Sequence, residues 1–176
     1  MKVLLTEDQL RDGIQRMANE IREHYAGRPL TIVGVLIGSV VLLADLIRRL
    51  DIPLRVEIIQ ARSYRGTRPG PLALNLDMLG EIRGREVLLV DDIFDTGHTL
   101  SELIPELDDQ GPLSVRTAVL LRKQGQATVP FQPNFVGFDI PNLFVVGFGL
   151  DYRDMYRNLP YVAALEPGEI TEEEGR

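Results

Sequence analysis

The segment that most constrains the fold of this chain is an uninterrupted apolar run that ends in paired carboxylates. Residues Val87–Val90 are all valine or leucine, and Asp91 and Asp92 follow directly. Such a run predicts a strand buried on both faces, which is typical of a parallel sheet covered by helices. Open α/β sheets bind ligands at the carboxyl ends of their strands. The sequence therefore predicts a ligand site at the two aspartates.

The residues after this strand have the chemistry of a phosphate site. Gly97 permits an unusual backbone angle, Thr96 and Thr99 supply hydroxyl groups, and the helix expected next supplies free N–H groups. Adjacent carboxylates disfavour each other's ionised forms, so Asp91 and Asp92 need a cation or hydroxyl groups to bind. This turn holds an anion without a lysine, but by itself it does not identify the ligand.

Length and charge limit the classes of protein that the chain can represent. Its 176 residues, 44% of them hydrophobic, suit a single domain over residues 1–176 with a substantial core. A formal net charge of -7 lacks the basic balance of a nucleic-acid-binding protein, so we expect no nucleic-acid partner. Part of the acidic excess lies in a tail, about residues 166–176, which we expect to be solvated.

The chain contains no cysteine, which excludes disulfides and a cysteine nucleophile and suits a cytoplasmic protein. The first residues turn polar after too short an apolar stretch for a signal peptide. No segment approaches the about 18 continuous apolar residues of a membrane span. We therefore expect a cytoplasmic protein with no membrane partner.

Strand and helix patterns alternate along the chain. Thr6 and Gln9 form a capping box, and the apolar spacing after them predicts a helix that ends near His24, which we expect at the surface and favoured by the helix dipole. This alternation predicts an α/β fold, with a central mainly parallel sheet flanked by helices and a small hood formed by the later elements. Helices are expected at 7–25, 40–50 and about 98–108, and strands at 30–36, 54–61, 74–79, 86–91, 114–121 and 161–165, with apolar segments at 135–138 and 144–148.

Residues 87–100 closely resemble the phosphoribosyl-pyrophosphate signature of the type I phosphoribosyltransferases, in the form with aspartate at position 95. The resemblance covers roughly residues 5–165 and is closest to the hypoxanthine(-guanine) phosphoribosyltransferases. It implies their fold and purine salvage: Mg²⁺-dependent transfer of ribose 5-phosphate from phosphoribosyl pyrophosphate to N9 of a 6-oxopurine base, hypoxanthine or guanine. The products would be IMP or GMP and pyrophosphate. Relatives form dimers or tetramers, so a homodimer or homotetramer is implied.

The same resemblance assigns roles within the signature. Asp91 and Asp92 would hold the ribose hydroxyls, directly or through Mg²⁺. Asp95, near the purine N7 in relatives, would be the catalytic general base or acid. His98 would contribute its backbone N–H rather than its ring. The implied residues that bind ribose and phosphate are Asp91, Asp92, Asp95, Thr96, Gly97, His98 and Thr99.

Residues 35–39 resemble the loop that binds pyrophosphate in the family. Relatives usually have a lysine before the glycine of this loop, whereas this chain has Ile37 before Gly38. The loop would then bind through backbone N–H groups, and the strained, often cis, peptide of the family is expected at Ile37–Gly38. Arg157 resembles the arginine that neutralises pyrophosphate. Ser63 and Tyr64 resemble the pair in the lid that closes over the reacting centre.

The purine site is implied by two further segments. Lys123 matches the purine-reading lysine, whose ammonium donates to a carbonyl oxygen at purine position 6 and would reject the amino group of adenine. Phe144 resembles the aromatic residue that stacks on the base, and Val145 the residue whose backbone contacts its edge. Asp151, in the same segment, resembles the carboxylate associated with magnesium, which would join Asp91 and Asp92 as a third metal-site residue.

Two alternatives share the fold. One is a phosphoribosyltransferase that prefers xanthine and guanine. The other is an RNA-binding regulator, such as the pyrimidine operon attenuator, which needs a basic RNA-binding face and commonly lacks the aspartate at position 95. The acidic balance and Asp95 favour the enzyme.

Overall fold

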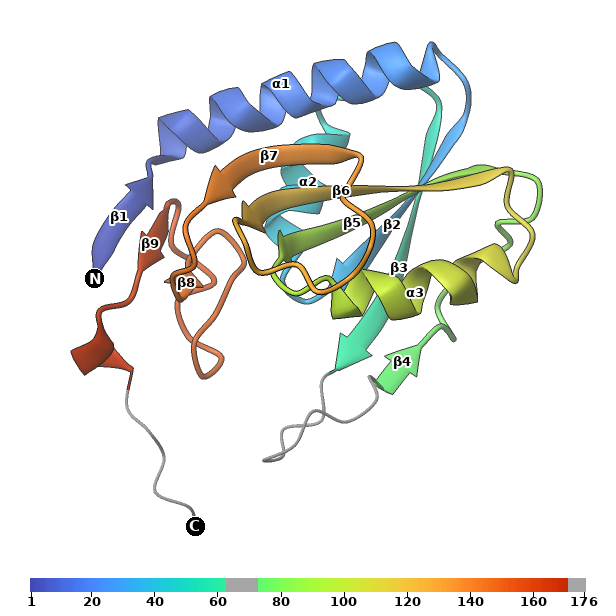
Figure 1. The fold of residues 1–176 in the computed structure, drawn as a ribbon. Helices are drawn as coiled ribbons and strands as arrows, with labels where there is room; N and C mark the ends of the chain where they lie inside the picture. Colours follow the sequence, from blue (N-terminus) through green and yellow to red (C-terminus); the bar gives the residue numbers. More distant parts are fainter. Residues whose placement is uncertain (63–72, 171–176) are drawn as a thin grey trace.

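In the computed structural model, which describes residues 1–62 and 73–170, helices cover both faces of a six-stranded sheet (Figure 1). The strand order is β4-β3-β2-β5-β6-β7, parallel throughout except for the pairing of β3 with β4. This confirms the α/β fold. The strands are β2 (Leu30–Leu36), β3 (Leu54–Arg62), β4 (Ala73–Asn75), β5 (Glu86–Phe94), β6 (Ser114–Lys123) and β7 (Phe135–Ile140), and the helices are α1 (Glu7–Tyr25), α2 (Val40–Ile47) and α3 (His98–Asp108).

Helix α1 has the bounds that its sequence predicts. The Thr6 hydroxyl accepts a hydrogen bond from the Gln9 backbone, and the Gln9 side chain accepts one from the Thr6 backbone, which completes the capping box. The helix packs closely on β7, because a Cβ at Gly13 would lie only 2.0 Å from the Phe138 ring. Helices α1 and α2 cover one face of the sheet and α3 covers the other, with a separate apolar cluster on each side.

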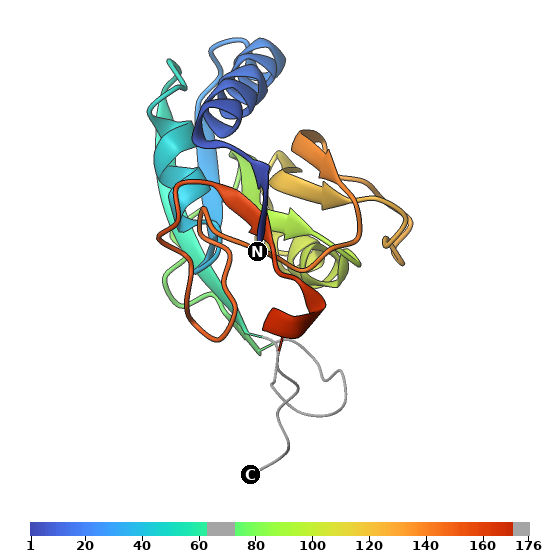
Figure 2. The same ribbon diagram turned by 90° about the vertical axis from the view of Figure 1, so that its left-hand side faces the viewer.

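A second sheet of three antiparallel strands forms the hood, in the order β1-β9-β8. Its strands are β1 (Lys2–Leu5), β8 (Val145–Val146) and β9 (Val162–Ala164). The hood lies at the carboxyl ends of the large sheet, as the two views in Figures 1 and 2 agree. Strand β1 was not predicted, because its short apolar stretch becomes a strand only by pairing with β9. The later strands β8 and β9 form the hood as predicted, whereas β7 extends the large sheet.

Several predicted boundaries differ from the structure, and three of the differences are the largest or bear on the site. Strand β5 continues past Asp91 to Phe94, because its ladder with β6 continues through the pairs of Asp91 with Val119 and Phe94 with Arg122. Asp92, predicted to follow the strand, therefore lies within it. Helix α2 ends at residue 47 instead of 50, and β4 covers residues 73–75 rather than 74–79.

The acidic tail is partly ordered. Residues Pro167–Glu169 form a single 3-10 turn (η1), and the carboxylates of Glu166 and Glu169 lie 3.6 and 2.6 Å from the amino group of Met1. Residues 166–169 are exposed, as expected for a solvated tail, although the ion pair with the first residue of the chain orders this turn. In the part of the chain that the structure describes, no helix is long and apolar enough to cross a membrane.

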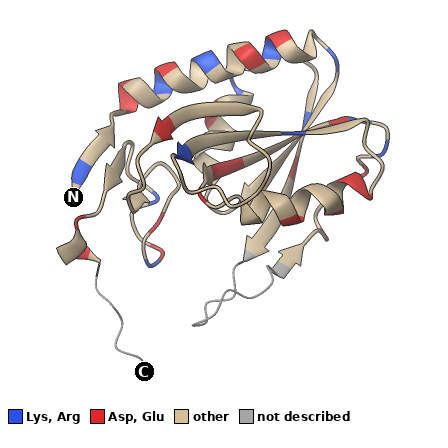
Figure 3. Cartoon of the chain, viewed as in Figure 1, with Lys and Arg blue, Asp and Glu red and all other residues tan. Residues whose placement is uncertain are grey.

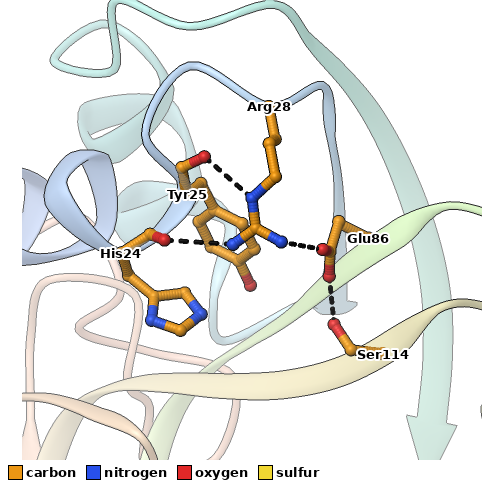
Figure 4. Close-up of polar contacts among 5 residues, drawn as sticks. All are labelled: His24, Tyr25, Arg28, Glu86 and Ser114. Carbon is orange, nitrogen blue, oxygen red and sulfur yellow. Dashed lines mark hydrogen bonds and ion pairs between the residues drawn. The ribbon is translucent and has the colours of Figure 1, made fainter.

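Polar contacts at the opposite end of the sheet tie α1 to two strands (Figure 4). Arg28 donates to the carbonyl oxygens of His24 and Tyr25, each at 3.0 Å, and pairs with the carboxylate of Glu86. Ser114 donates to the other carboxylate oxygen of Glu86. Because Glu86 and Ser114 begin β5 and β6, this cluster fixes the amino ends of the strands whose carboxyl ends carry the predicted site.

His24 is exposed in the last turn of α1, as predicted. Burial nevertheless lowers the pKa of its imidazole, and the neighbouring charges of Arg116 and Arg28 lower it further. The expected stabilisation of the charged ring by the helix dipole is therefore opposed by two nearby guanidinium groups. Burial also raises the pKa of the adjacent Tyr25 to about 12, so this phenol stays protonated in the core.

Candidate functional site

A cavity of about 720 Å³ opens at the carboxyl ends of β2 and β5, beneath the hood. Four segments far apart in the sequence form its wall, and three of them lie where β2, β3 and β5 end, as expected at one edge of a parallel sheet. They include most of the predicted site, with additional residues of β2 and β3. The lining residues are Val35–Gly38, Gln60, Ala61, Asp91–Leu100, Asp151, Asp154 and Arg157.

Asp91 and Asp92 are the most strongly perturbed carboxyl groups of this cavity. Asp91 is only 6% exposed, and its Oδ1 accepts a hydrogen bond from the Asp92 backbone at 2.9 Å. Burial raises the pKa of Asp91 well above its usual value, and the charge of Asp92 raises it further. Burial also raises the pKa of Asp92, although hydrogen bonds and the charge of Arg157 oppose that rise. The pair is therefore arranged to receive hydroxyl groups or a cation.

The predicted phosphate turn joins β5 to α3. Gly97 has φ +88° and is buried, and a Cβ there would meet Val129 at 2.3 Å and the Phe94 ring at 2.9 Å, so only glycine is accommodated. Helix α3 begins at the next residue, His98, which places its free N–H groups at the cavity. The structure thus confirms a glycine turn followed by a helix N-terminus, the arrangement in which proteins bind anions.

The predicted pyrophosphate loop packs tightly against two other segments. A Cβ at Gly38 would lie 1.7 Å from Asp92 Oδ2, and a Cβ at Gly149 would lie 2.2 Å from the Gly38 carbonyl oxygen. Gly149 also has φ +100°, which favours glycine. The cis peptide joins Leu36 to Ile37, one bond earlier than predicted. The Ile37 side chain is 53% exposed and lines the cavity.

Arg157 connects the hood to the cavity. Its Nη2 lies 2.8 Å from Asp151 Oδ1, and its Nη1 donates to the Gly149 carbonyl oxygen at 2.7 Å. Both contacts leave the guanidinium in the cavity wall, where it acts on the charge of Asp92. The structure therefore brings Asp151 and Arg157 together, as an ion pair, on the side where the predicted pyrophosphate loop lies.

The predicted metal ligands do not all meet. Asp91, Asp92 and Asp151 line one cavity, yet residues 1–62 and 73–170 contain no group of three acidic, histidine or cysteine side chains placed to hold a metal ion. Mg²⁺ usually takes one or two protein carboxylates and completes its shell with water and phosphate oxygens. The Asp91–Asp92 pair suits that mode of binding, since it offers carboxyl oxygens at the cavity.

Lys123 and Asp95 form the closest ion pair beside the cavity. Lys123 is the last residue of β6 rather than a residue after the strand, and its Nζ donates to Asp95 Oδ2 at 2.6 Å. The Lys123 side chain is only 11% exposed, which distinguishes it from a solvated surface lysine. The structure thus joins the predicted purine reader to the predicted catalytic carboxylate.

Other predicted site residues lie farther from the cavity wall. Phe144 is 43% exposed, and its ring meets the edge of Tyr152 at 5.5 Å between centroids. Val145 is buried in β8 opposite Ala164. Neither lines the cavity, so their purine-binding roles stay predictions. The lid residues Ser63 and Tyr64 lie outside the described residues.

Sequence reasoning missed several residues of the wall. Gln60 and Ala61 line it because β3 ends there, and the sequence of that segment signals only a strand. Asp154 was also missed, although its spacing from Asp151 in a polar turn was a usable signal.

Comparison with known proteins defines the class to which this fold and site belong. Residues 4–153 match the phosphoribosyl transferase domain, and the chain belongs to that family. Solved structures agree. A hypoxanthine-guanine phosphoribosyltransferase from Bacillus anthracis has a TM-score of 0.89 and 33% identity, covering 94% of this chain and 99% of that one. A Trypanosoma cruzi hypoxanthine phosphoribosyltransferase mutant, complexed with the product IMP, has a TM-score of 0.88 and 39% identity, covering 96% and 91%.

Within this family, the chain falls in the hypoxanthine-guanine phosphoribosyltransferase group. It is 40% identical to that enzyme from Lactococcus lactis over 168 residues, 94% of this chain and 91% of the relative. It is 36% identical to the Staphylococcus aureus enzyme, over 94% of each chain. The chain also matches bifunctional TilS/HprT proteins of Listeria at 39% identity, and there it spans only about a quarter of the relative's length.

Proposed function

We propose that this chain transfers ribose 5-phosphate from phosphoribosyl pyrophosphate to N9 of hypoxanthine or guanine, forming IMP or GMP and pyrophosphate in purine salvage. The observation that carries this proposal is the Lys123–Asp95 pair, 2.6 Å apart, beside a phosphate-binding turn and a buried carboxylate pair. That combination supplies groups for the base, the sugar and the phosphate of such a reaction.

The turn at residues 95–99 binds the 5-phosphate of the donor. Its backbone N–H groups and the hydroxyls of Thr96 and Thr99 replace the hydration shell of the phosphate, and the dipole of α3 favours its negative charge. Asp91 and Asp92 accept hydrogen bonds from the ribose hydroxyls. These contacts hold the anomeric carbon between the purine and the leaving group.

The ion pair recognises the purine. The Lys123 ammonium donates to the carbonyl oxygen at position 6, and Asp95 accepts the proton at the adjacent N7. As the bond from N9 to the anomeric carbon forms, the bond to pyrophosphate breaks and the purine proton passes to Asp95. Adenine presents an amino donor to Lys123, which leaves two donors facing each other.

The pyrophosphate leaving group is bound on the side of the cavity formed by the Gly38 loop and Arg157. Backbone groups around Gly38 and the guanidinium of Arg157 bind the pyrophosphate as it departs with the bonding electron pair. Because Ile37 provides no cation, Arg157 is the principal positive side chain for this anion among the described lining residues.

We propose Mg²⁺ as the cofactor, held by Asp91 and Asp92 together with substrate oxygens. When bound, Mg²⁺ supplies a Lewis acid that reduces the negative charge of pyrophosphate. The support is chemical: two adjacent carboxyl groups, one of them buried, offer the oxygen ligands that Mg²⁺ prefers.

The deciding experiment incubates the purified chain with phosphoribosyl pyrophosphate, Mg²⁺ and one purine base at a time. Nucleotide formation is followed by chromatography for hypoxanthine, guanine, xanthine and adenine. We expect IMP and GMP, no AMP, and loss of turnover when EDTA removes the metal. Absence of product with both hypoxanthine and guanine refutes the proposal, and product without metal refutes the role of Mg²⁺.

The alternatives have less support. Along α1, basic and acidic residues alternate in the sequence (Figure 3), whereas an RNA-binding regulator needs a basic face. A preference for xanthine is tested by the same assay. We also propose a homodimer or homotetramer, as the family resemblance implies, and light scattering of the purified chain tests this assembly.

A further inference from the structure

The connection between β6 and β7, residues 124–134, runs beside the start of α3 and touches the phosphate turn (Figure 1). Thr128 makes two contacts with one atom of that turn. Its backbone N–H donates to the Thr96 carbonyl oxygen at 3.0 Å, and its hydroxyl lies 3.3 Å from the same oxygen. A segment outside the cavity wall thus determines where the Thr96 carbonyl points.

The direction of this carbonyl fixes the next N–H group. In a trans peptide the C=O and N–H bonds point in opposite directions, and Thr96–Gly97 is not the cis bond of this chain. With its carbonyl oxygen held by Thr128, the peptide turns the N–H of Gly97 away from the connection. Both residues also line the cavity.

Apolar contacts from the same connection hold the turn in place. Val129 occupies the space above Gly97 that a side chain would take, with its Cγ2 2.3 Å from an ideal Cβ position. Two residues later, Phe131 meets the Phe94 ring at 5.7 Å between centroids. Gly97, with φ +88°, has broad conformational freedom, so these contacts restrict a residue that would otherwise move readily.

We propose that Thr128 and Val129 are positioning residues for the donor phosphate: they lock the Thr96–Gly97 peptide with its N–H directed at the phosphate. The inference rests on the proposed function and extends it to a segment that touches no substrate. Because Lys123 immediately precedes the connection, one stretch of chain both presents the purine reader and holds the phosphate turn.

The test compares binding of phosphoribosyl pyrophosphate, measured by calorimetry with Mg²⁺, with the KM for hypoxanthine. Thr128→Pro removes both donors, and Val129→Ala removes the cover over Gly97. Each is expected to raise the dissociation constant of phosphoribosyl pyrophosphate about three- to tenfold, because the turn keeps its phosphate-binding groups and loses only contacts that orient them. The KM for hypoxanthine should change less than twofold. Thr128→Ser keeps both donors and should bind like the parent chain.

A matched control is Gln132→Ala in the same connection, since the Gln132 side chain contacts Arg122 and should leave binding unchanged. Circular dichroism checks folding, and Thr128→Ala replaces Thr128→Pro if the proline variant does not fold. Folded variants with unaltered donor binding, or with equal losses for donor and purine, overturn the proposal. A parent chain that binds the donor but forms no nucleotide refutes the proposed activity instead, and the binding comparison still decides the positioning role.

Discussion

Lys123 Nζ lies 2.6 Å from Asp95 Oδ2, so the groups proposed to read the purine and to take its proton form one ion pair. The contact arises because β5 and β6 are parallel neighbours, and Phe94, the last residue of β5, pairs in register with Arg122, the residue before the end of β6. The residue that follows each of these two, Asp95 or Lys123, then meets the other. Recognition and proton transfer are therefore linked through a single contact.

Replacing the lysine should affect the two substrates differently. We expect Lys123→Ala to raise the KM for hypoxanthine about ten- to a hundredfold, the cost of a lost hydrogen bond from a charged group. The KM for phosphoribosyl pyrophosphate should change far less. Steady-state kinetics with each substrate varied in turn measures both. Arg122→Ala is the control, because Arg122 pairs with Asp139 instead; equal effects on both KM values would contradict the role of Lys123.

The carboxylate should matter for turnover more than for binding. Asp95→Asn keeps the shape of the side chain but cannot take the purine proton, so kcat should fall by about 10²–10⁴ if proton transfer limits the rate. Calorimetry should show only modest changes in substrate affinity. Unchanged turnover would remove Asp95 from acid–base catalysis.

The isoleucine in the pyrophosphate loop predicts weak binding of pyrophosphate. Ile37 is exposed at the cavity, so a lysine there can reach the anion without entering the core. Ile37→Lys should strengthen pyrophosphate inhibition about tenfold through a charge-assisted contact. Ile37→Met, which adds no charge, is the control. Equal inhibition constants for the lysine variant and the parent chain would count against this explanation.

A single methyl group should disrupt the carboxylate pair. In Gly38→Ala the new Cβ would lie 1.7 Å from Asp92 Oδ2, so either the loop or the carboxylate must move. Displacement of about an ångström in a catalytic site can cost about 100-fold, and we expect kcat/KM for phosphoribosyl pyrophosphate to fall by that order. Gly168→Ala, where no atom lies within 4 Å of the added Cβ, should retain parent activity. Full activity of Gly38→Ala would show that the contact is not required.

Acid should remove one identifiable contribution to stability. The Arg122 guanidinium, hydrogen-bonded to Asp139, lowers the pKa of that carboxyl in the folded chain. The pair therefore stabilises the fold above the unfolded pKa of about 3.9, and this stabilisation is lost as pH falls through the lower folded value. Because both side chains are partly exposed, Asp139→Asn should cost only about 0.5–1 kcal/mol at pH 7.

Urea unfolding of Asp139→Asn and the parent chain at pH 7 and pH 3 measures this difference. The difference in the free energy of unfolding between the two chains should be smaller at pH 3 than at pH 7. High salt at pH 7 should also reduce this difference, because ions screen exposed pairs. A difference in the free energy of unfolding that is the same at both pH values would mean that the charge of Asp139 is not its source.

An element of this fold can be predicted from the sequence when the residues that stabilise it are close to it in the chain. The capping box and the spacing of apolar residues identify α1 from neighbouring residues alone. Strand β1 has no such signal, because Lys2–Leu5 is ordered by pairing with a strand at the other end of the chain. The end of β5 was misplaced for a similar reason: the strand continues from Asp91 to Phe94 only because β6 lies beside it.

The site divides in the same way. The turn around Gly97 carries its chemistry in consecutive residues and could be predicted, together with the helix that follows. The ion pair of Lys123 with Asp95, and the contact of Arg157 with Asp151, depend on which strands and loops become neighbours. The sequence predicts that these four side chains belong to the site, but only the fold shows how they are paired.

The packing of Gly149 on the carbonyl oxygen of Gly38 also affects the point during synthesis at which the protein can bind its ligands. This contact closes the pyrophosphate side of the cavity with a segment made late in translation. A nascent chain that has already formed β2 and β5 would contain the two aspartates and the phosphate turn. It would still lack the segment from Gly149 to Arg157, which closes the cavity on the side of the leaving group. Ligand binding should therefore begin only after the hood has emerged from the ribosome and packed against the sheet. Binding during synthesis then reports that the hood is in place, not merely that the sheet has formed.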